Sequence, residues 1–219
     1  EANLLIEPNY EFSAEFFECK LNDGYTLLNL ESFLSTLVRS DLEQNNLKYD
    51  VNVYFPKPNY VNQFIINVKN YADQDIYNYI LDRLSRRGFD EIAGCKFDKE
   101  DLYGQSLLVN KIDINNPDYV SEILRCEYND GYNYGTFRIA IDRLALEIKS
   151  LNISYEALYL HKKDNPNSFI WINNIYEENF SSEISSNWIK NPIAENIKKE
   201  FIENAKCIDA RAYDAFLIT

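Results

Sequence analysis

The sequence predicts an α+β fold, built as a tandem repeat of two ferredoxin-like β-α-β-β-α-β units that cover residues 1–104 and 105–219. Two observations lead to this prediction. A short motif recurs in the second half of the chain, and each half shows the same order of strand-like and helix-like periodicity. The length of 219 residues also allows two small domains.

The repeat starts from a motif around the first cysteine of each half. Residues 18–25 read ECKLNDGY and residues 125–132 read RCEYNDGY, so five of eight positions are identical at an offset of 107. The agreement in residue character extends without a gap over positions 15–53. Cys95 and Cys207 also correspond, at an offset of 112, so the four cysteines form two equivalent pairs.

The first elements of each unit are a strand, a turn and a helix. Apolar and small or polar residues alternate over Tyr10–Phe16, which predicts a half-buried strand. The Asn-Asp-Gly turn follows, where Gly24 and Gly131 can adopt a positive φ. Apolar residues then recur at three- and four-residue spacing over 27–38 and 137–148, which predicts helices with Thr26 and Thr136 as N-caps.

The later elements complete the ferredoxin-like order. Two strands are predicted in each unit, then a second helix and a last strand that begins near Glu91 or Ile208. The predicted strands are Lys48–Phe55, Val61–Val68, Ser154–His161 and Ser168–Ile175, and the predicted helices are Asp73–Arg87 and Pro192–Lys206. Pro192 suits the first turn of a helix, where its missing N–H has no partner to lose.

The cysteine pairs test this topology, because the first and last strands of such a unit lie side by side. We expect Cys19 to lie next to Cys95, and Cys126 next to Cys207, as buried neighbouring thiols. Disulfides are the alternative, and they would imply an oxidising compartment. Zinc is not expected, because the chain has no Cys-x-x-Cys and no clustered histidines.

Composition limits the partners of the protein. The net charge is −13, from 35 acidic and 22 basic residues, and both halves are acidic. This field repels nucleic acid and acidic membrane surfaces and attracts a basic partner, although it can also serve only solubility. No apolar run approaches the ~20 residues that cross a bilayer. Residues 1–7 are too briefly apolar for a signal peptide, so a cytoplasmic location is expected.

No catalytic, metal-binding or phosphate-binding signature is present. His161 is the only histidine and is expected to be an ordinary strand-end residue. The six glycines include no Gly-x-Gly-x-x-Gly and no Walker loop. The acidic groups at 73–75, 98–101 and 177–178 have spacings too common to indicate a metal site. We therefore expect no catalytic residue, no metal and no cofactor, and a protein that is not an enzyme.

Tyrosine is the residue type that the predicted core does not explain, with 17 copies. Its rigid ring and polar tip suit protein interfaces, although such rings can equally cover the sheet and the helices. The predicted partner contacts lie in the two Asn-Asp-Gly-Tyr turns, the run 128–134 and an insertion at 177–191. They are Asp23, Tyr25, Tyr128, Asp130, Tyr132, Tyr134, Glu177, Glu178 and Trp188.

These features favour a non-enzymatic acidic binding protein that inhibits or neutralises a basic protein partner, of the immunity or anti-defence type. Opposite charge speeds such an association and fixes its register. The alternative is a small-ligand-binding regulatory protein with its site between the two repeats. An enzyme would need two carboxylates, or a tyrosine and a carboxylate, that converge in a cleft with perturbed pKa values.

Overall fold

The computed structural model describes residues 6–45, 48–57, 62–72, 75–110, 118–151, 153–176 and 192–218, which form a mixed α+β fold. The first half contains β1 (Phe12–Leu21), α1 (Leu27–Asn45), β2 (Tyr49–Pro56), β3 (Gln63–Asn70), α2 (Ile76–Arg86), α3 (Phe89–Ile92), β4 (Ala93–Lys96) and β5 (Leu102–Asn110). The second half contains β6 (Asp118–Tyr128), α4 (Tyr134–Leu151), β7 (Tyr155–Lys162), β8 (Ser168–Ile175), α6 (Pro192–Asn204) and β9 (Ala205–Ile218).

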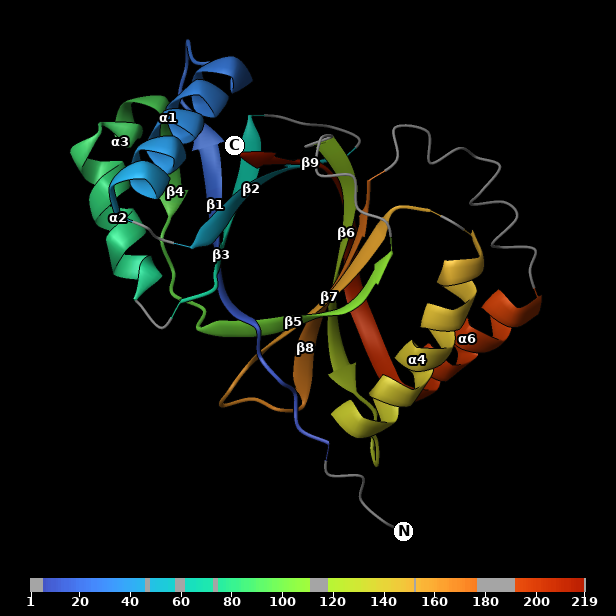
Figure 1. Ribbon diagram of the computed structural model, residues 1–219. Coiled ribbons are helices and arrows are strands. Elements are labelled where there is room, and N and C mark those ends of the chain that lie inside the picture. Colours follow the sequence, from blue (N-terminus) through green and yellow to red (C-terminus); the bar gives the residue numbers. More distant parts are fainter. Residues whose placement is uncertain are drawn as a thin grey trace.

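The strands form one large antiparallel sheet that closes on itself. Its order is β3-β2-β9-β6-β8-β7-β5-β1-β4, and β3 also pairs with β1. This last pairing joins eight strands into a ring, and β4 lies beside β1 as an additional strand. In Figure 1, α1, α2 and α3 lie outside the ring on one side, and α4 and α6 lie outside it on the other.

Two segments close the ring: β5, which the sequence analysis did not assign, and the end of β9, for which it gave only a start near Ile208. β5 pairs with β7 along most of its length and with β1 at Phe12–Ala14. The end of β9 pairs with β6 and also with β2 over residues 51–56. The alternation of β5 is interrupted by a register shift between Ser106 and Leu108, which explains why a period of two does not reveal this strand.

Most of the predicted helices and strands are confirmed, with two local corrections. α4 begins at Tyr134 and not after Thr136, because the Asn133 side chain accepts hydrogen bonds from the backbone N–H groups of Gly135 and Thr136 at 2.8 and 3.2 Å. The strand predicted near Glu91 is preceded by the short helix α3 and begins at Ala93. No helix in the described ranges has the length and apolar character needed to span a membrane.

The recurring Asn-Asp-Gly-Tyr motif is a turn that caps a helix. Gly24 and Gly131 adopt the predicted positive φ, at 87° and 84°. The Asn22 side chain donates to the carbonyl oxygens of residues 90 and 91, at the end of α3. The Asn129 side chain donates in the same way to the carbonyl oxygens of residues 202 and 203 in α6. The motif therefore satisfies carbonyl groups that a helix end leaves without partners.

The cysteines pair as predicted, but they are oxidised. Cys19 lies opposite Cys95, and Cys126 lies opposite Cys207, each with 4.0 Å between the Cα atoms. Each pair forms a disulfide, which is the alternative named above, so the expectation of free thiols is wrong. The two cysteines of each pair lie on adjacent strands, which places their sulfur atoms close enough to bond. The prediction of free thiols considered only their burial in the apolar core.

Strand alternation divides the apolar side chains between two kinds of core. Outward-facing residues such as Phe17 and Val53 pack under α1, α2 and α3, and others such as Tyr159 and Trp171 pack under α4 and α6. Inward-facing residues form two smaller clusters inside the ring. The buried members of these clusters are Phe12, Ala14, Leu102, Leu158, Leu160, Ile170 and Ile172 in one, and Tyr54, Tyr119, Tyr213 and Ala215 in the other.

Candidate functional site

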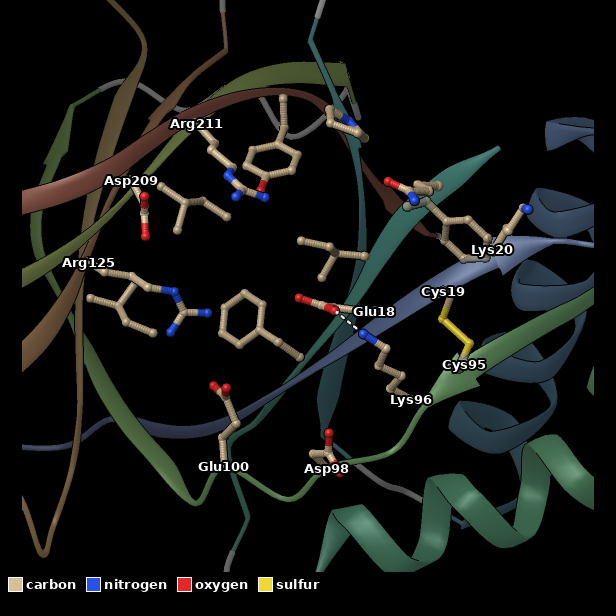
Figure 2. A pocket seen from close by; sticks show the side chains of 18 of the residues that line it. Glu18, Cys19, Lys20, Cys95, Lys96, Asp98, Glu100, Arg125, Asp209 and Arg211 are labelled. Carbon is tan, nitrogen blue, oxygen red and sulfur yellow. Dashed lines mark hydrogen bonds and ion pairs between the residues drawn. A yellow bond between two sulfur atoms is a disulfide. The ribbon is translucent and has the colours of Figure 1, made fainter. Parts of the chain in front are cut away.

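A pocket of about 750 Å³ lies at one end of the ring interior, between strands of the first and second halves. Most of its apolar wall comes from inward-facing residues, with Phe64 of the outer core beside them, and its other lining side chains are largely charged. The apolar residues are Phe16, Phe64, Ile65, Ile123 and Ile170, joined by the ring of Tyr213. The charged residues are Glu18, Lys20, Lys96, Asp98, Glu100, Arg125, Asp209 and Arg211 (Figure 2).

The strands place these side chains through simple alternation. On β1, Phe16 and Glu18 are two residues apart and share the inward face. On β6, Ile123 and Arg125 do the same. Cys19 points to the opposite face of β1, so the Cys19–Cys95 disulfide fixes β1 to β4 beside the pocket (Figure 2).

The charges of the pocket are unevenly paired. Lys96 Nζ lies 3.2 Å from Glu18 Oε2 on the β1 side. On the opposite wall, Arg125 and Arg211 form no ion pair with a described residue, and both side chains extend into the pocket in Figure 2. Burial raises the pKa of Tyr213, and the positive charge of the neighbouring Arg211 opposes this increase.

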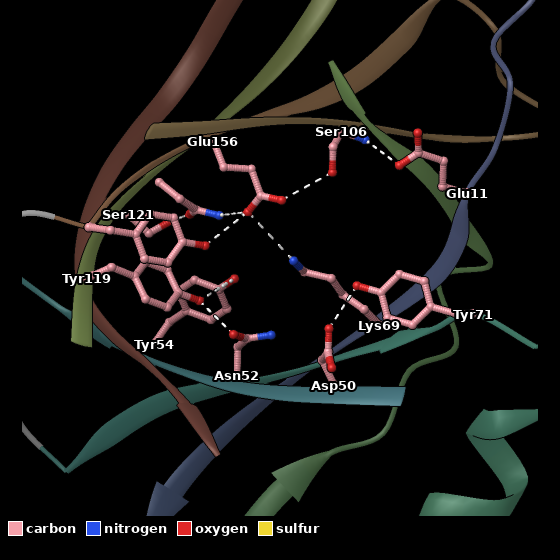
Figure 3. A network of polar contacts seen from close by, with 12 residues as sticks. Glu11, Asp50, Asn52, Tyr54, Lys69, Tyr71, Ser106, Tyr119, Ser121 and Glu156 are labelled. Atoms are coloured by element: carbon pink, nitrogen blue, oxygen red, sulfur yellow. Dashed lines mark hydrogen bonds and ion pairs between the residues drawn. The ribbon is translucent and has the colours of Figure 1, made fainter. Parts of the chain in front are cut away.

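The other end of the interior contains a buried polar network (Figure 3). The Glu156 carboxylate accepts hydrogen bonds from Ser106 Oγ, Asn174 Nδ2 and the Tyr176 hydroxyl, at 3.1, 3.1 and 3.0 Å. Lys69 Nζ lies 3.9 Å from the same carboxylate, and both side chains are about nine-tenths buried. These contacts join β3, β5, β7 and β8 across the ring, and they satisfy a charge that burial would otherwise make costly.

Tyrosines connect the network with the pocket. The Tyr213 ring lies 6.0 Å from the Tyr54 ring, which lies 6.3 Å from the Tyr119 ring. The Tyr119 hydroxyl donates to Asn52 Oδ1 at 2.8 Å, while Asn52 Nδ2 is buried and has no hydrogen-bond partner among the described residues. Burial raises the pKa of Tyr54 and of Tyr119, so these phenols stay protonated.

The described residues provide no recognisable metal-binding group. No cluster of three or more His, Cys, Asp or Glu side chains among them could hold a metal ion. All four cysteines are in disulfides. His161 lies near the end of β7 as predicted, with Nδ1 2.6 Å from its neighbour's carbonyl oxygen and Nε2 against the Tyr10 hydroxyl. We therefore derive no chemical step through a metal.

The predicted partner contacts do not form one site in the described structure. Asp23, Tyr25, Asp130 and Tyr132 lie exposed in the two Asn-Asp-Gly-Tyr turns, which follow β1 and β6 respectively. Glu177, Glu178 and Trp188 fall outside the described residues.

Two tyrosines of the run 128–134 pack into the protein. The Tyr128 hydroxyl hydrogen-bonds to that of Tyr159 at 3.0 Å, and its ring packs on Phe169. Tyr134 is 9% exposed and its hydroxyl accepts a hydrogen bond from Gln105 at 2.6 Å. These two rings therefore cover the sheet and the helix, which is the plainer of the two interpretations of the tyrosine excess.

Several solved structures share the fold of this chain over nearly its whole length. A candidate monooxygenase from Lactobacillus acidophilus superposes with a TM-score of 0.61 at 12% identity, over 94% of this chain and 96% of that one. A candidate monooxygenase from Fusobacterium nucleatum gives 0.58 at 9% identity, over 96% and 94%. A chlorite dismutase mutant from Candidatus Nitrospira defluvii gives 0.57 at 9% identity, over 95% and 92%. Neither a protein-family model nor a curated protein matches the chain.

These similarities correct the function predicted from the sequence. The three proteins named above are described as monooxygenases or as a chlorite dismutase, and none as an inhibitor of a basic protein. The non-enzymatic inhibitor of the immunity or anti-defence type is therefore wrong, and so is the expectation that the protein is not an enzyme. Net charge misled the prediction because it describes the whole surface, whereas the pocket has its own local balance of charges.

Sequence reasoning missed Arg125 and Arg211 as site residues. Arg125 stands in the repeated motif where the first half has Glu18, and both side chains line the pocket. This exchange of charge at equivalent positions was a usable signal. Arg211 was not accessible to the same reasoning, because its strand was assigned only from its start near Ile208 and its register was unknown.

Proposed function

We propose that this protein binds a small, mainly apolar molecule in the pocket and acts on it as an enzyme. The observation that supports this most strongly is the pocket itself, with an apolar wall, charged lining residues and contributions from both halves of the chain. Small-molecule sites commonly combine an apolar lining with a few polar groups that orient the ligand. A pocket between the two halves also agrees with the alternative that the sequence analysis left open.

Oxidation by dioxygen is the first reaction to test. Two of the structures that share the fold are described as candidate monooxygenases. The pocket of this chain offers Tyr213, Glu18, Asp98, Glu100 and Asp209 as groups that could accept or donate a proton to a bound molecule.

We also propose that the two halves are ferredoxin-like units, residues 1–104 and 105–219. The strand order β4-β1-β3-β2 in the first half and β9-β6-β8-β7 in the second supports this proposal. The matching helix caps support it too, because Asn22 and Asn129 bind carbonyl groups whose numbers differ by 112, the same offset that separates Cys95 and Cys207.

A binding screen tests the site. Small aromatic and alicyclic molecules are screened by thermal shift on the wild-type protein, on Ile123→Trp and on Leu146→Trp. Ile123 lines the pocket, and Leu146 is 69% exposed on α4, so the second variant is a matched control. A ligand at 100 times its Kd adds about 2.7 kcal/mol to the stability of the folded state. For a chain of this size that corresponds to a rise in Tm of roughly 5–10 °C.

We expect Ile123→Trp to lose the shift and Leu146→Trp to keep it. Ligands that stabilise both variants equally would place the site elsewhere, and a screen without any ligand would refute the proposal. Each ligand that binds is then incubated with the wild-type protein, and the uptake of dioxygen is measured with an oxygen electrode. Binding in the pocket without oxygen uptake would leave the site standing and reject the oxidising reaction.

A further inference from the structure

Two arginines share the pocket-facing side of neighbouring strands. In the β6–β9 ladder, Ile123 pairs with Arg211 and Arg125 pairs with Ile208. Residues directly opposite each other in a ladder project to the same face, so Arg211 shares the face of Ile123. Arg125 is two residues further along β6 and also shares it, with its Cα about 7 Å from that of Ile123. Both guanidinium groups therefore start from one wall, as Figure 2 shows.

A bulge in β9 sets this arrangement. Between the two pairs β6 advances by two residues and β9 by three, so one residue of β9 is extra. Asp209 lies in this bulge with a φ of 55°, a left-handed conformation that side-chain-bearing residues rarely adopt. Bulges often re-aim side chains next to functional sites. In a regular strand, Cys207, Asp209 and Arg211 would all project to the same face. Here Asp209 and Arg211 line the pocket, whereas Cys207 points to the opposite face and forms the outer disulfide.

Like charges on one face of a sheet repel each other, and Arg125 and Arg211 share this face with their side chains exposed to solvent. The chain has 13 more acidic than basic residues, yet no described carboxylate forms an ion pair with Arg125 or Arg211. On the β1 side, by contrast, Lys96 is paired with Glu18. Asp209 and Glu100 also line the pocket, but neither forms an ion pair with the arginines. An anionic group of a ligand, held between the two guanidinium groups, would pair with both and relieve their repulsion.

The chemistry of the wall specifies the ligand further. A guanidinium group offers a planar fork of N–H donors that matches a carboxylate with two parallel hydrogen bonds. Beside it lie Phe16, Ile65 and Ile170, which offer an apolar surface to a flat ring system. A volume of about 750 Å³ falls in the range of pockets that enclose drug-sized molecules.

We propose that the ligand is an aromatic carboxylic acid, whose carboxylate is held by Arg125 and Arg211 and whose ring lies on the apolar wall. This inference rests on the proposed function, because it names the class of molecule that the pocket takes. It assigns the two arginines as binding residues that determine specificity for the anion.

Two probes of the same shape test the clamp: 2-naphthoate and its neutral amide, 2-naphthamide. Their affinities are measured by isothermal titration calorimetry for the wild-type protein, for Arg125→Gln, for Arg211→Gln and for Arg39→Gln. Arg39 is exposed on α1 and does not line the pocket, so it controls for loss of one positive charge. Circular dichroism and Tm verify that each variant is folded.

We expect the wild-type protein to bind 2-naphthoate at least ~10-fold more tightly than 2-naphthamide, because hydrogen bonds between charged groups are each worth roughly a factor of 10 to 100. Each pocket variant should weaken 2-naphthoate binding by a similar factor and change 2-naphthamide binding by less than twofold. Arg39→Gln should change neither. Arg125→Lys and Arg211→Lys, which keep the charge and lose the fork, should fall between wild type and the Gln variants.

The outcomes separate this inference from the proposed function. Equal binding of both probes, blocked by Ile123→Trp, would overturn the arginine clamp and leave the pocket as the site. If Arg39→Gln weakened 2-naphthoate binding as much as the pocket variants do, the effect would come from overall charge, and this too would overturn the clamp. Absence of binding by either probe would reject the aromatic acid as the ligand class, whereas the broader screen would still decide whether the pocket binds small molecules.

Discussion

Gly104 lies where β5 closes the ring, and replacing it with alanine tests that closure. A Cβ built at this position would lie 2.7 Å from Cε2 of Phe12 and 2.9 Å from Cγ of Leu160. Both neighbours belong to the core inside the ring, and carbon atoms prefer separations of about 3.5–4.0 Å. The new methyl group therefore has no room unless Phe12 or Leu160 moves.

The expected loss of stability follows from two opposing effects. Overpacking a well-filled core destabilises by roughly 1–3 kcal/mol. Replacing glycine by alanine in a strand stabilises by about 0.5–1 kcal/mol, because the unfolded chain loses freedom. We expect Gly104→Ala to lower the free energy of unfolding by about 1–2 kcal/mol. Gly94→Ala in β4 is the matched control, since nothing lies within 4 Å of its Cβ, and it should leave stability unchanged or slightly raised.

Urea unfolding followed by circular dichroism measures both variants. With a slope of about 3 kcal/mol per molar urea, Gly104→Ala should shift the midpoint down by roughly 0.5 M. Phe12→Leu frees space beside the new methyl group, so Gly104→Ala should be less harmful in that background than in the wild type. Equal midpoints for Gly104→Ala and Gly94→Ala would refute the close packing of β5 against the interior.

Three further predictions concern one disulfide, one buried carboxyl group and one buried ion pair. Reducing Cys126–Cys207, which closes a loop with a sequence separation of 81, should lower the free energy of unfolding by about 4 kcal/mol, and an unchanged Tm in dithiothreitol would contradict this. Burial raises the pKa of Glu15 above its ordinary 4.5, so its contribution to stability is lost as the pH rises through the raised value. Glu15→Gln should therefore be more stable than wild type at pH 7 and gain less at pH 4, and a loss at pH 7 in urea unfolding would refute this. Lys69→Met or Glu156→Gln alone should each destabilise by roughly 3–5 kcal/mol, while the double variant should recover most of it, and additive losses would show that the pair is not coupled.

Local sequence patterns predicted most of the elements because each half has a regular period. β8 was predicted with its observed bounds, and Gly24 and Gly131 were predicted to adopt the positive φ that they show. The cap of α4 was misplaced because Asn133 and Thr136 are both good capping residues. The choice between them depends on which backbone N–H groups each side chain reaches.

Closure of the ring could not be predicted in this way. β5 and the end of β9 pair with strands of the other half of the chain, and such pairing leaves no local period. The pocket follows from that closure, since Tyr213 comes from the end of β9 that pairs with β2 while Phe16 comes from β1. The sequence showed that cysteines would be neighbours, but their oxidation depends on the register that places Cys19 directly opposite Cys95.

Function in this fold should come from the positions at which the two proposed units differ on their inward faces. Outward-facing positions agree between the units, as Cys19 and Cys126 do, because both must pack under helices or form a disulfide. Inward positions diverge: Ala14 corresponds to Ser121, which joins the buried network, and Glu18 corresponds to Arg125 in the pocket. A ring made of two identical units would present the same groups at both ends of its interior. The substitutions in the second unit instead place Arg125 in the pocket at one end and Ser121 in the buried network of Glu156 at the other, so the two ends differ in their chemistry.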